Sequence, residues 1–141
     1  MSRELLNKHP SITKYTTIWM DTLRDGKSQL VNTNKLIRNY KGMTGLKTGS
    51  TSLALYNLSA SATRDGLSLI AVIMKGPTGA IRFSEAQKLL DYGFSNYQYK
   101  ELAGKYECLK NVTVQKGTED NLNILFDEDA GVIIKKAKTK I

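Results

Sequence analysis

The chain has few of the residues that form disulfide bonds or bind metal ions. Among its 141 residues are one cysteine, Cys108, and one histidine, His9. A single cysteine excludes an intrachain disulfide framework, and without a Cys/His cluster we expect no zinc site. We interpret Cys108 as a buried small residue. His9 precedes Pro10, and we interpret it as an exposed turn residue, not the base of a Ser-His-Asp triad.

Long apolar runs are also missing. No stretch approaches the roughly 18 residues that a membrane-spanning helix needs. The first residues, Met1 to Glu4, lead into polar sequence and not into the apolar segment of a signal peptide. The content of 40% hydrophobic and 24% charged residues is that of an ordinary globular protein. A chain of this length corresponds to one domain, or to one domain and part of another.

Negative charge is scarce in the first part of the chain. The net charge is +8, and residues 1–99 hold 13 Lys and Arg against 6 Asp and Glu. Such a basic segment suits nucleic acid, an anionic surface or a carboxylate substrate. No RNA-binding or zinc-finger motif accompanies it, and aromatic residues do not alternate with the basic ones. We therefore expect no nucleic acid partner.

Two segments near the centre predict an antiparallel hairpin. Residues 53–63 alternate between apolar and polar positions, which is the period of a strand. Arg64-Asp65-Gly66 supplies a tight turn. Residues 67–74 are almost continuously apolar, as expected of a strand that is covered on both faces.

A helix is predicted after this hairpin, over residues 83–92, because its apolar residues follow at helical spacing and form one stripe. Ser84 and Gln87 fit a capping box, and Gly93 is the expected stop. From about residue 100 the pattern changes to short strand-like runs, which predict a separate all-β segment. These runs are Cys108–Val114, Leu122–Phe126 and Val132–Lys135.

One short motif carries chemistry. Lys47-Thr48-Gly49 precedes the hairpin, on an expected third strand. At a sheet edge the ammonium group supplies positive potential, the hydroxyl can donate to a carboxylate, and the glycine leaves room for a substrate backbone. A K-[S/T]-G triplet arises by chance in about one chain in five of this composition, so its context decides.

The context resembles the low-molecular-mass penicillin-binding proteins, which are serine-type D-Ala-D-Ala carboxypeptidases of the peptidase S11 group. The similar stretches are Gly45–Thr51, Tyr56–Thr63, Arg82 and Leu89–Phe94. The resemblance implies an α+β fold. Residues 1–99 would be the K-T-G half of an antiparallel-sheet and helix domain of the transpeptidase-like (β-lactamase-like) kind. Residues 100–141 would be the beginning of a β-rich C-terminal domain.

The family's chemistry also uses the motifs S-x-x-K, which holds the nucleophile, and S-x-N. The sequence contains no S-x-N, and its one S-x-x-K match runs from Ser11 to Lys14. About one such match is expected by accident. It also lies close before Lys47, whereas the family's nucleophile lies far upstream with S-x-N between. We therefore expect the back part of a carboxypeptidase, without its nucleophile and inactive alone.

The resemblance implies roles for five residues. Lys47 would give electrostatic support to the general base, and Thr48 would bind the terminal carboxylate of the substrate. Gly49 would lie along the substrate backbone, and the backbone N–H of Ser50 would donate to the oxyanion. Arg82 would be a second carboxylate anchor. No metal and no cofactor are implied.

The implied substrate is the D-Ala-D-Ala pentapeptide stem of peptidoglycan, trimmed by acyl transfer to water, and complete enzymes of the family bind β-lactams. The family acts outside the cytoplasmic membrane, at the cell envelope. Two alternatives stay open. One is a β-lactamase-related acyl hydrolase, disfavoured by residues 53–94 and the β-rich tail. The other is a non-catalytic module that binds anionic cell-wall polymers or peptides.

An unpaired sheet edge is a further expectation from the resemblance. In the family, other parts of the catalytic domain extend the sheet beyond residues 67–74. A long apolar edge without an internal charge or proline is a template for pairing with another strand. We therefore expect an edge-to-edge oligomer, or a partner that supplies the missing N-terminal half.

Overall fold

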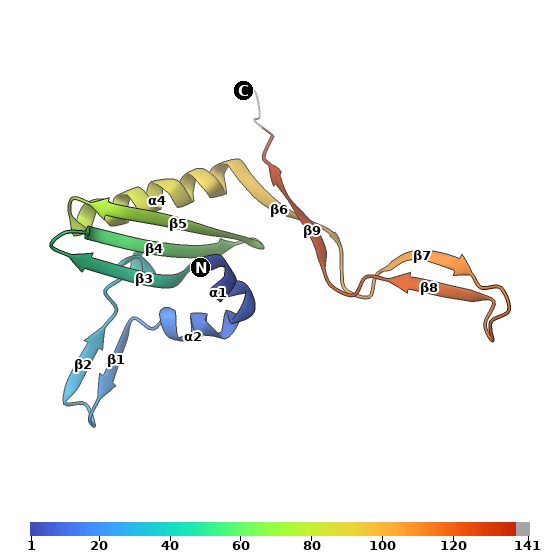
Figure 1. The fold of residues 1–141 in the computed structure, drawn as a ribbon, viewed down its shortest axis with the longest axis horizontal. Coiled ribbons are helices and arrows are strands. Elements are labelled where there is room, and N and C mark those ends of the chain that lie inside the picture. Colours follow the sequence, from blue (N-terminus) through green and yellow to red (C-terminus); the bar gives the residue numbers. More distant parts are fainter. Residues whose placement is uncertain (138–141) are drawn as a thin grey trace. The chain divides into compact units, whose positions relative to one another are not determined.

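The computed structural model describes residues 1–137 and divides the chain into two units, Met1–Asn96 and a second that begins at Tyr97. Unit 1 combines helices with an antiparallel sheet, and the described part of unit 2 contains strands and loops (Figure 1). The α+β class expected from the sequence is confirmed. No helix within residues 1–137 is long and apolar enough to cross a membrane.

Unit 1 is built on a three-stranded antiparallel sheet with the order β3-β4-β5. The strands are β3 (Met43–Thr51), β4 (Leu55–Arg64) and β5 (Leu67–Gly76). The predicted hairpin is confirmed as β4 and β5, which pair from Arg64 opposite Leu67 to Tyr56 opposite Gly76. β3 pairs with the other side of β4, so β3 and β5 are the two edge strands of this sheet.

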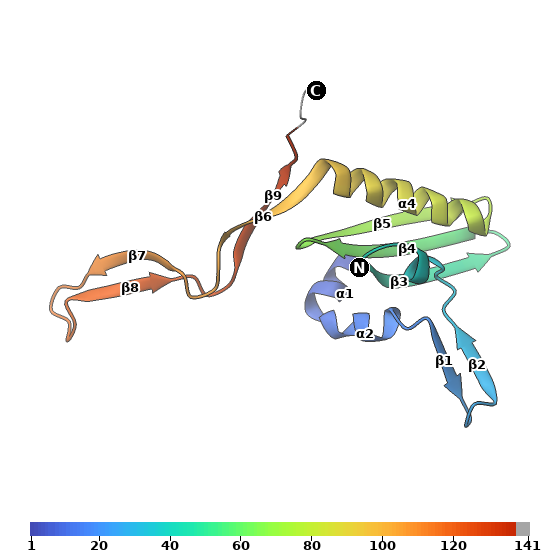
Figure 2. The ribbon, with the colours of Figure 1, turned by 180° about the vertical axis from the view of Figure 1, so that it is seen from behind.

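The core of unit 1 lies between the sheet and the helix α4 (Gly79–Asn96), which packs on β4 and β5 (Figures 1 and 2). The sheet contributes three buried alanines, Ala60, Ala62 and Ala71, so the two layers approach closely. The core side chains with at most 9% of their surface exposed include Leu58, Ala60, Ala62, Ala71, Phe83, Ala86, Leu90 and Phe94.

The helix α4 is longer than the sequence predicts at both ends. It begins after Thr78, whose hydroxyl oxygen accepts a hydrogen bond from the N–H of Ile81 at 3.2 Å, as a capping side chain does. Ser84 therefore lies inside the helix and is not a cap. Gly93 does not stop the helix. A Cβ at Gly93 would lie 2.4 Å from Cδ1 of Leu69, so the glycine is needed for close packing against β5.

The prediction that both faces of residues 67–74 are covered is wrong. Val72 is 55% exposed and Met74 is 79% exposed. Val72 pairs with Ser59, and the hydroxyl of Ser59 lies 2.9 Å from the hydroxyl of Ser2 in the helix α1 (Ser2–Lys8). That helix contacts β4 and leaves the neighbouring part of β5 open.

The remaining elements of unit 1 lie between α1 and β3. They are the 3₁₀ turn η1 (Pro10–Ile12), α2 (Thr13–Thr16), β1 (Met20–Leu23), β2 (Ser28–Val31) and α3 (Leu36–Asn39). β1 and β2 form an antiparallel hairpin that projects from the sheet (Figures 1 and 2). The chain returns from this hairpin to β3 through a polar loop and α3.

Unit 2 consists of two antiparallel strand pairs, β6 with β9 and β7 with β8. The bounds are β6 (Tyr97–Ala103), β7 (Cys108–Thr113), β8 (Asn121–Leu125) and β9 (Ala130–Lys135). The three predicted runs correspond to β7, β8 and β9, and β6 was not predicted. Cys108 is exposed, contrary to expectation, because no second layer covers its strand pair within the described residues.

Candidate functional site

The Lys47-Thr48-Gly49 triplet lies in the second half of the edge strand β3. On one side the strand pairs with β4, where Lys47, Thr48 and Gly49 face Ser59, Leu58 and Asn57. Within residues 1–137 no strand pairs with the other side of β3. An edge of this kind offers backbone N–H and C=O groups to an extended ligand.

Thr48 is the buried member of the triplet, with 8% of its surface exposed. Its hydroxyl lies 2.6 Å from the hydroxyl of Thr33, so the two oxygens share a hydrogen bond. Thr33 is exposed and belongs to the loop between β2 and α3. Sequence reasoning did not find Thr33, because it read the loop only as polar.

Two asparagines hold this loop in place. The amide nitrogen of Asn32 donates to the carbonyls of Thr16 (3.2 Å) and Ile18 (2.9 Å), and its oxygen accepts from the N–H of Asn34 (2.9 Å). Asn34 is 2% exposed, and its amide nitrogen donates to the carbonyl of Gly45 on β3 (3.3 Å). Side-chain bonds of this kind define the loop as regular secondary structure would. Because Asn32 and Asn34 flank Thr33, their hydrogen bonds also fix the position of Thr33.

The strand β3 also packs closely against α2. The hydroxyl of Thr16 donates to the carbonyl of Thr44 at 2.6 Å. Gly45 has φ +145°, and a Cβ there would lie 2.8 Å from Cβ of Thr16. Only glycine fits at such a φ and such a distance. The part of β3 that precedes the triplet is therefore held by α2 and by the loop of Thr33.

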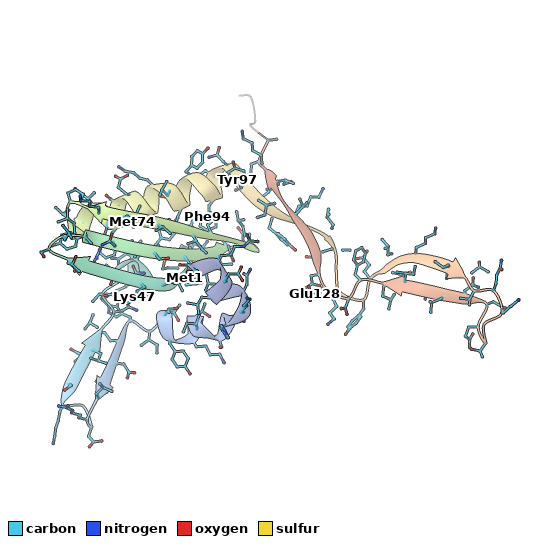
Figure 3. All side chains as sticks on the ribbon, in the orientation of Figure 1. Met1, Lys47, Met74, Phe94, Tyr97 and Glu128 are labelled. Atoms are coloured by element: carbon cyan, nitrogen blue, oxygen red, sulfur yellow. The ribbon has the colours of Figure 1, made fainter. Side chains whose placement is uncertain are left out.

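Lys47 is exposed, and its ammonium group donates to the carbonyl of Thr48. Its positive charge is therefore held beside the backbone of the triplet. Figure 3 shows Lys47 on β3, at the part of the sheet from which the β1–β2 hairpin emerges.

Gly49 and Ser50 border free space. A Cβ at Gly49 would meet no other atom within 4 Å, so packing inside the described residues does not require a glycine there. Ser50 is exposed and lines a shallow hollow of about 400 Å³. The other residues that line it are Thr51, Ser52, Leu55 and Tyr56.

Arg82 reaches the triplet from the first turns of α4. It is 9% exposed, and its Nη1 lies 3.3 Å from the carbonyl oxygens of both Gly49 and Asn57. Its guanidinium also stacks on the rings of Tyr56 (5.4 Å) and Phe83 (4.7 Å). Within residues 1–137 its Nε is buried and has no hydrogen-bond partner. The charge therefore lies against the backbone of β3 and β4.

The residues of the S-x-x-K match are not assembled into a nucleophile within the part of the chain that the structure describes. Ser11 is exposed on η1, and no hydrogen bond joins its hydroxyl to Lys14 or to the triplet. His9 is exposed as expected. An activated serine needs a base within hydrogen-bond reach.

Comparison with known families gives a match over the first part of the chain. Residues 1–78 match the sequence model of the peptidase S11 family, described as D-alanyl-D-alanine carboxypeptidase. The chain is 38% identical to the D-alanyl-D-alanine carboxypeptidase DacF of Bacillus subtilis, over 98% of this chain and 36% of DacF. It therefore spans about a third of the length of that relative.

Solved structures of penicillin-binding proteins have the same fold. Penicillin-binding protein 5 of Haemophilus influenzae superimposes with a TM-score of 0.75 at 29% identity, over 98% of this chain and 40% of that one. Penicillin-binding protein D2 of Listeria monocytogenes, with cefotaxime bound, gives a TM-score of 0.62 at 33% identity, over 66% of this chain and 37% of that one. The chain thus belongs to the peptidase S11 family, the D-alanyl-D-alanine carboxypeptidases.

Proposed function

We propose that β3 of this chain forms one wall of the active site of a serine D-Ala-D-Ala carboxypeptidase. The observation that carries the proposal is the placement of the triplet: Thr48 has its hydroxyl anchored, and Gly49 faces free space, on a strand with an open edge. The substrate class is a peptide that ends in D-Ala-D-Ala, as in the peptidoglycan stem. In the complete enzyme β-lactams occupy the same wall, as the cefotaxime-bound relative supports.

Each residue has a defined task in this proposal. Lys47 supplies positive potential, Thr48 donates to the terminal carboxylate, and Gly49 gives the substrate backbone room to lie along β3. The N–H of Ser50 is one donor to the developing oxyanion, a contribution of about two to three orders of magnitude in rate. Arg82 is the second source of positive charge for the carboxylate, and its bonds to β3 and β4 also fix the strand that carries the site.

The nucleophile of the complete enzyme is proposed to lie outside the triplet half. The isolated position of Ser11 and the missing S-x-N motif support this reading. The S11 match supports a carboxypeptidase over the β-lactamase-related alternative. The same match also favours an enzyme over a non-catalytic cell-wall-binding module. We further propose that the complete enzyme acts at the cell envelope.

The edge of β5 is proposed to pair with a further strand, either from the rest of a catalytic domain or from a second copy of this chain. Val72 and Met74 are exposed on this strand. A hollow of about 630 Å³ lies beside its beginning and is lined in part by Leu6, Ala62 and Ile70. We also propose that unit 2 is the start of a β-rich C-terminal domain.

The experiment that tests the active-site wall is a binding measurement on the 141-residue chain. An N-acetylated D-Ala-D-Ala peptide and the same peptide with a C-terminal amide are titrated in turn, with amide chemical shifts as the readout. We expect the carboxylate form to bind more tightly and to shift the signals of residues 47–50. Equal binding of both peptides, or shifts elsewhere in unit 1, would contradict the proposal.

A further inference from the structure

We propose that Thr33 is a positioning residue that fixes the direction in which the Thr48 hydroxyl donates its proton. This inference rests on the proposed function of Thr48. Its basis is the 2.6 Å contact between the two hydroxyl oxygens, which joins the triplet to a residue 15 positions earlier in the chain. Thr33 lies outside the K-T-G motif, and in this proposal it acts on the ligand through Thr48.

The chemistry of two hydroxyls permits two arrangements. Each threonine has one proton to donate and lone pairs that accept. Where Thr48 donates to Thr33, it has only lone pairs left for a ligand. Where Thr33 donates to Thr48, the proton of Thr48 is free to bond a ligand. An ionised carboxylate accepts hydrogen bonds and donates none, so it selects the second arrangement.

The second arrangement forms a chain of hydrogen bonds from Thr33 through Thr48 to the carboxylate. Each bond in such a chain polarises the next, which strengthens the bond to the charged end. Removing the Thr33 hydroxyl leaves the Thr48 hydroxyl free to rotate, which weakens the hydrogen bond that Thr48 donates to the carboxylate. Thr33 therefore acts on carboxylate binding through another residue.

The surrounding structure holds the first donor still. The loop of Thr33 is fixed at both ends, by Asn32 bonded to Thr16 and Ile18 and by Asn34 bonded to Gly45. Gly45 precedes the triplet on the same strand as Thr48. The loop and β3 therefore keep a constant separation, and the hydroxyl pair needs no ordering when a ligand arrives.

A purely structural role makes a different prediction. If the Thr33–Thr48 bond only tied the loop to β3, its loss would lower stability and would weaken every ligand of β3 alike. A role in positioning the proton affects ligands with a carboxylate and spares those without one. The two peptides used to test the proposed function separate these cases.

The experiment uses the full 141-residue chain and four variants. Thr33→Val removes the hydroxyl at nearly constant shape, Thr33→Ala removes it with a smaller side chain, and Thr33→Ser keeps it. Thr63→Val is the matched control, because it breaks a similar hydroxyl pair with Ser68 (2.8 Å) in the same sheet, outside the site. Thr33 is exposed, so at least one of the hydroxyl-deleting variants should fold, and thermal unfolding identifies it.

The expected result is specific to the carboxylate. Thr33→Val and Thr33→Ala should weaken binding of the N-acetylated D-Ala-D-Ala peptide about threefold to tenfold and leave the amide peptide unchanged. Thr33→Ser and Thr63→Val should bind both peptides as the unaltered chain does.

Two results would overturn the inference and leave the proposed function standing. One is unchanged carboxylate binding in the hydroxyl-deleting variants, and the other is an equal loss for both peptides. If the unaltered chain itself fails to distinguish the two peptides, the carboxylate site fails, and the inference falls with it.

Discussion

The phenol of Tyr40 donates a hydrogen bond of 2.7 Å to the carboxylate of Asp91, which joins the end of α3 to α4. The guanidinium of Arg64 stacks between the same phenol ring (4.5 Å) and the ring of Phe94 (4.4 Å). Burial, and secondly the hydrogen bond to Asp91, raise the pKa of Tyr40 from 10.0 to about 12. These contacts thus connect the end of α3 and the end of β4 to α4.

This pair predicts a loss of stability at high pH. The pKa of Tyr40 is higher in the folded chain, so its contribution is complete below about pH 10 and disappears as the pH rises through about 12. Tyr40→Phe should lower the free energy of unfolding at pH 8, by about 1 to 3 kcal/mol, and flatten its decline between pH 10 and 12. Urea unfolding at a series of pH values measures both. Parallel curves for the two proteins would contradict the prediction.

Thr48→Val should reduce affinity for the N-acetylated D-Ala-D-Ala peptide. The variant keeps the shape of the side chain and loses the hydroxyl, and a hydrogen bond to a charged partner contributes about 1.5 to 3 kcal/mol. In a complete enzyme that carries this segment, the same change should slow acylation by peptide and by penicillin. Unchanged second-order acylation would remove Thr48 from the site.

We expect the 141-residue chain not to be labelled by a fluorescent penicillin. The hydroxyl of Ser11 has no hydrogen-bonded base within residues 1–137, so nothing there activates it. Fluorescence in a denaturing gel is the readout, with penicillin-binding protein D2 of Listeria monocytogenes, which is known in cefotaxime-bound and ampicillin-bound forms, as the positive control. Labelling that disappears in Ser11→Ala would identify Ser11 as the nucleophile.

The open edge of β5 should produce association between chains. Light scattering is expected to show a dimer or larger species, and Val72→Lys and Met74→Lys should each shift it toward the monomer, because edge charges oppose strand pairing. Both positions are exposed, so the fold tolerates the change. A stable monomer with slow amide exchange throughout residues 67–74 would contradict the prediction.

Gly93→Ala should destabilise unit 1, although alanine ordinarily favours a helix over glycine. The added Cβ would lie 2.4 Å from Leu69, and crowding of this kind costs about 1 to 3 kcal/mol. Leu69→Ala in the same chain should relieve the crowding and recover part of the loss relative to Leu69→Ala alone. Gly49→Ala is the control, since its Cβ meets no atom within 4 Å. An unchanged melting temperature for Gly93→Ala would show that β5 adjusts freely.

The sequence pattern predicted what depends on local periodicity. Residues 53–63 showed the alternation of a half-buried strand, and the apolar stripe from Phe83 to Phe94 showed a helix. The boundaries of α4 were harder to predict, because the Ser84-x-x-Gln87 pattern fits a capping box whether it lies at the start of a helix or inside one. The hydroxyl of Thr78 competes for the same task and begins the helix earlier.

Contacts between distant segments could not be predicted from patterns. Thr33 meets Thr48 only because two asparagine side chains fold the intervening loop onto β3. Likewise, the exposure of Val72 depends on how far α1 extends over the sheet. The apolar run of residues 67–74 carries no information on that distance. The triplet itself was found from sequence, and the roles assigned to its residues stay predictions.

The bonds of Arg82 have a consequence for motion. One guanidinium nitrogen bridges the carbonyls of Gly49 and Asn57, so β3 cannot move away from β4 without breaking two partly buried hydrogen bonds to a charged group. The hairpin of β1 and β2, with exposed strands, has no comparable restraint in the described residues. Fluctuations should therefore be small along the proposed active-site wall on β3 and large at the tip of the β1–β2 hairpin.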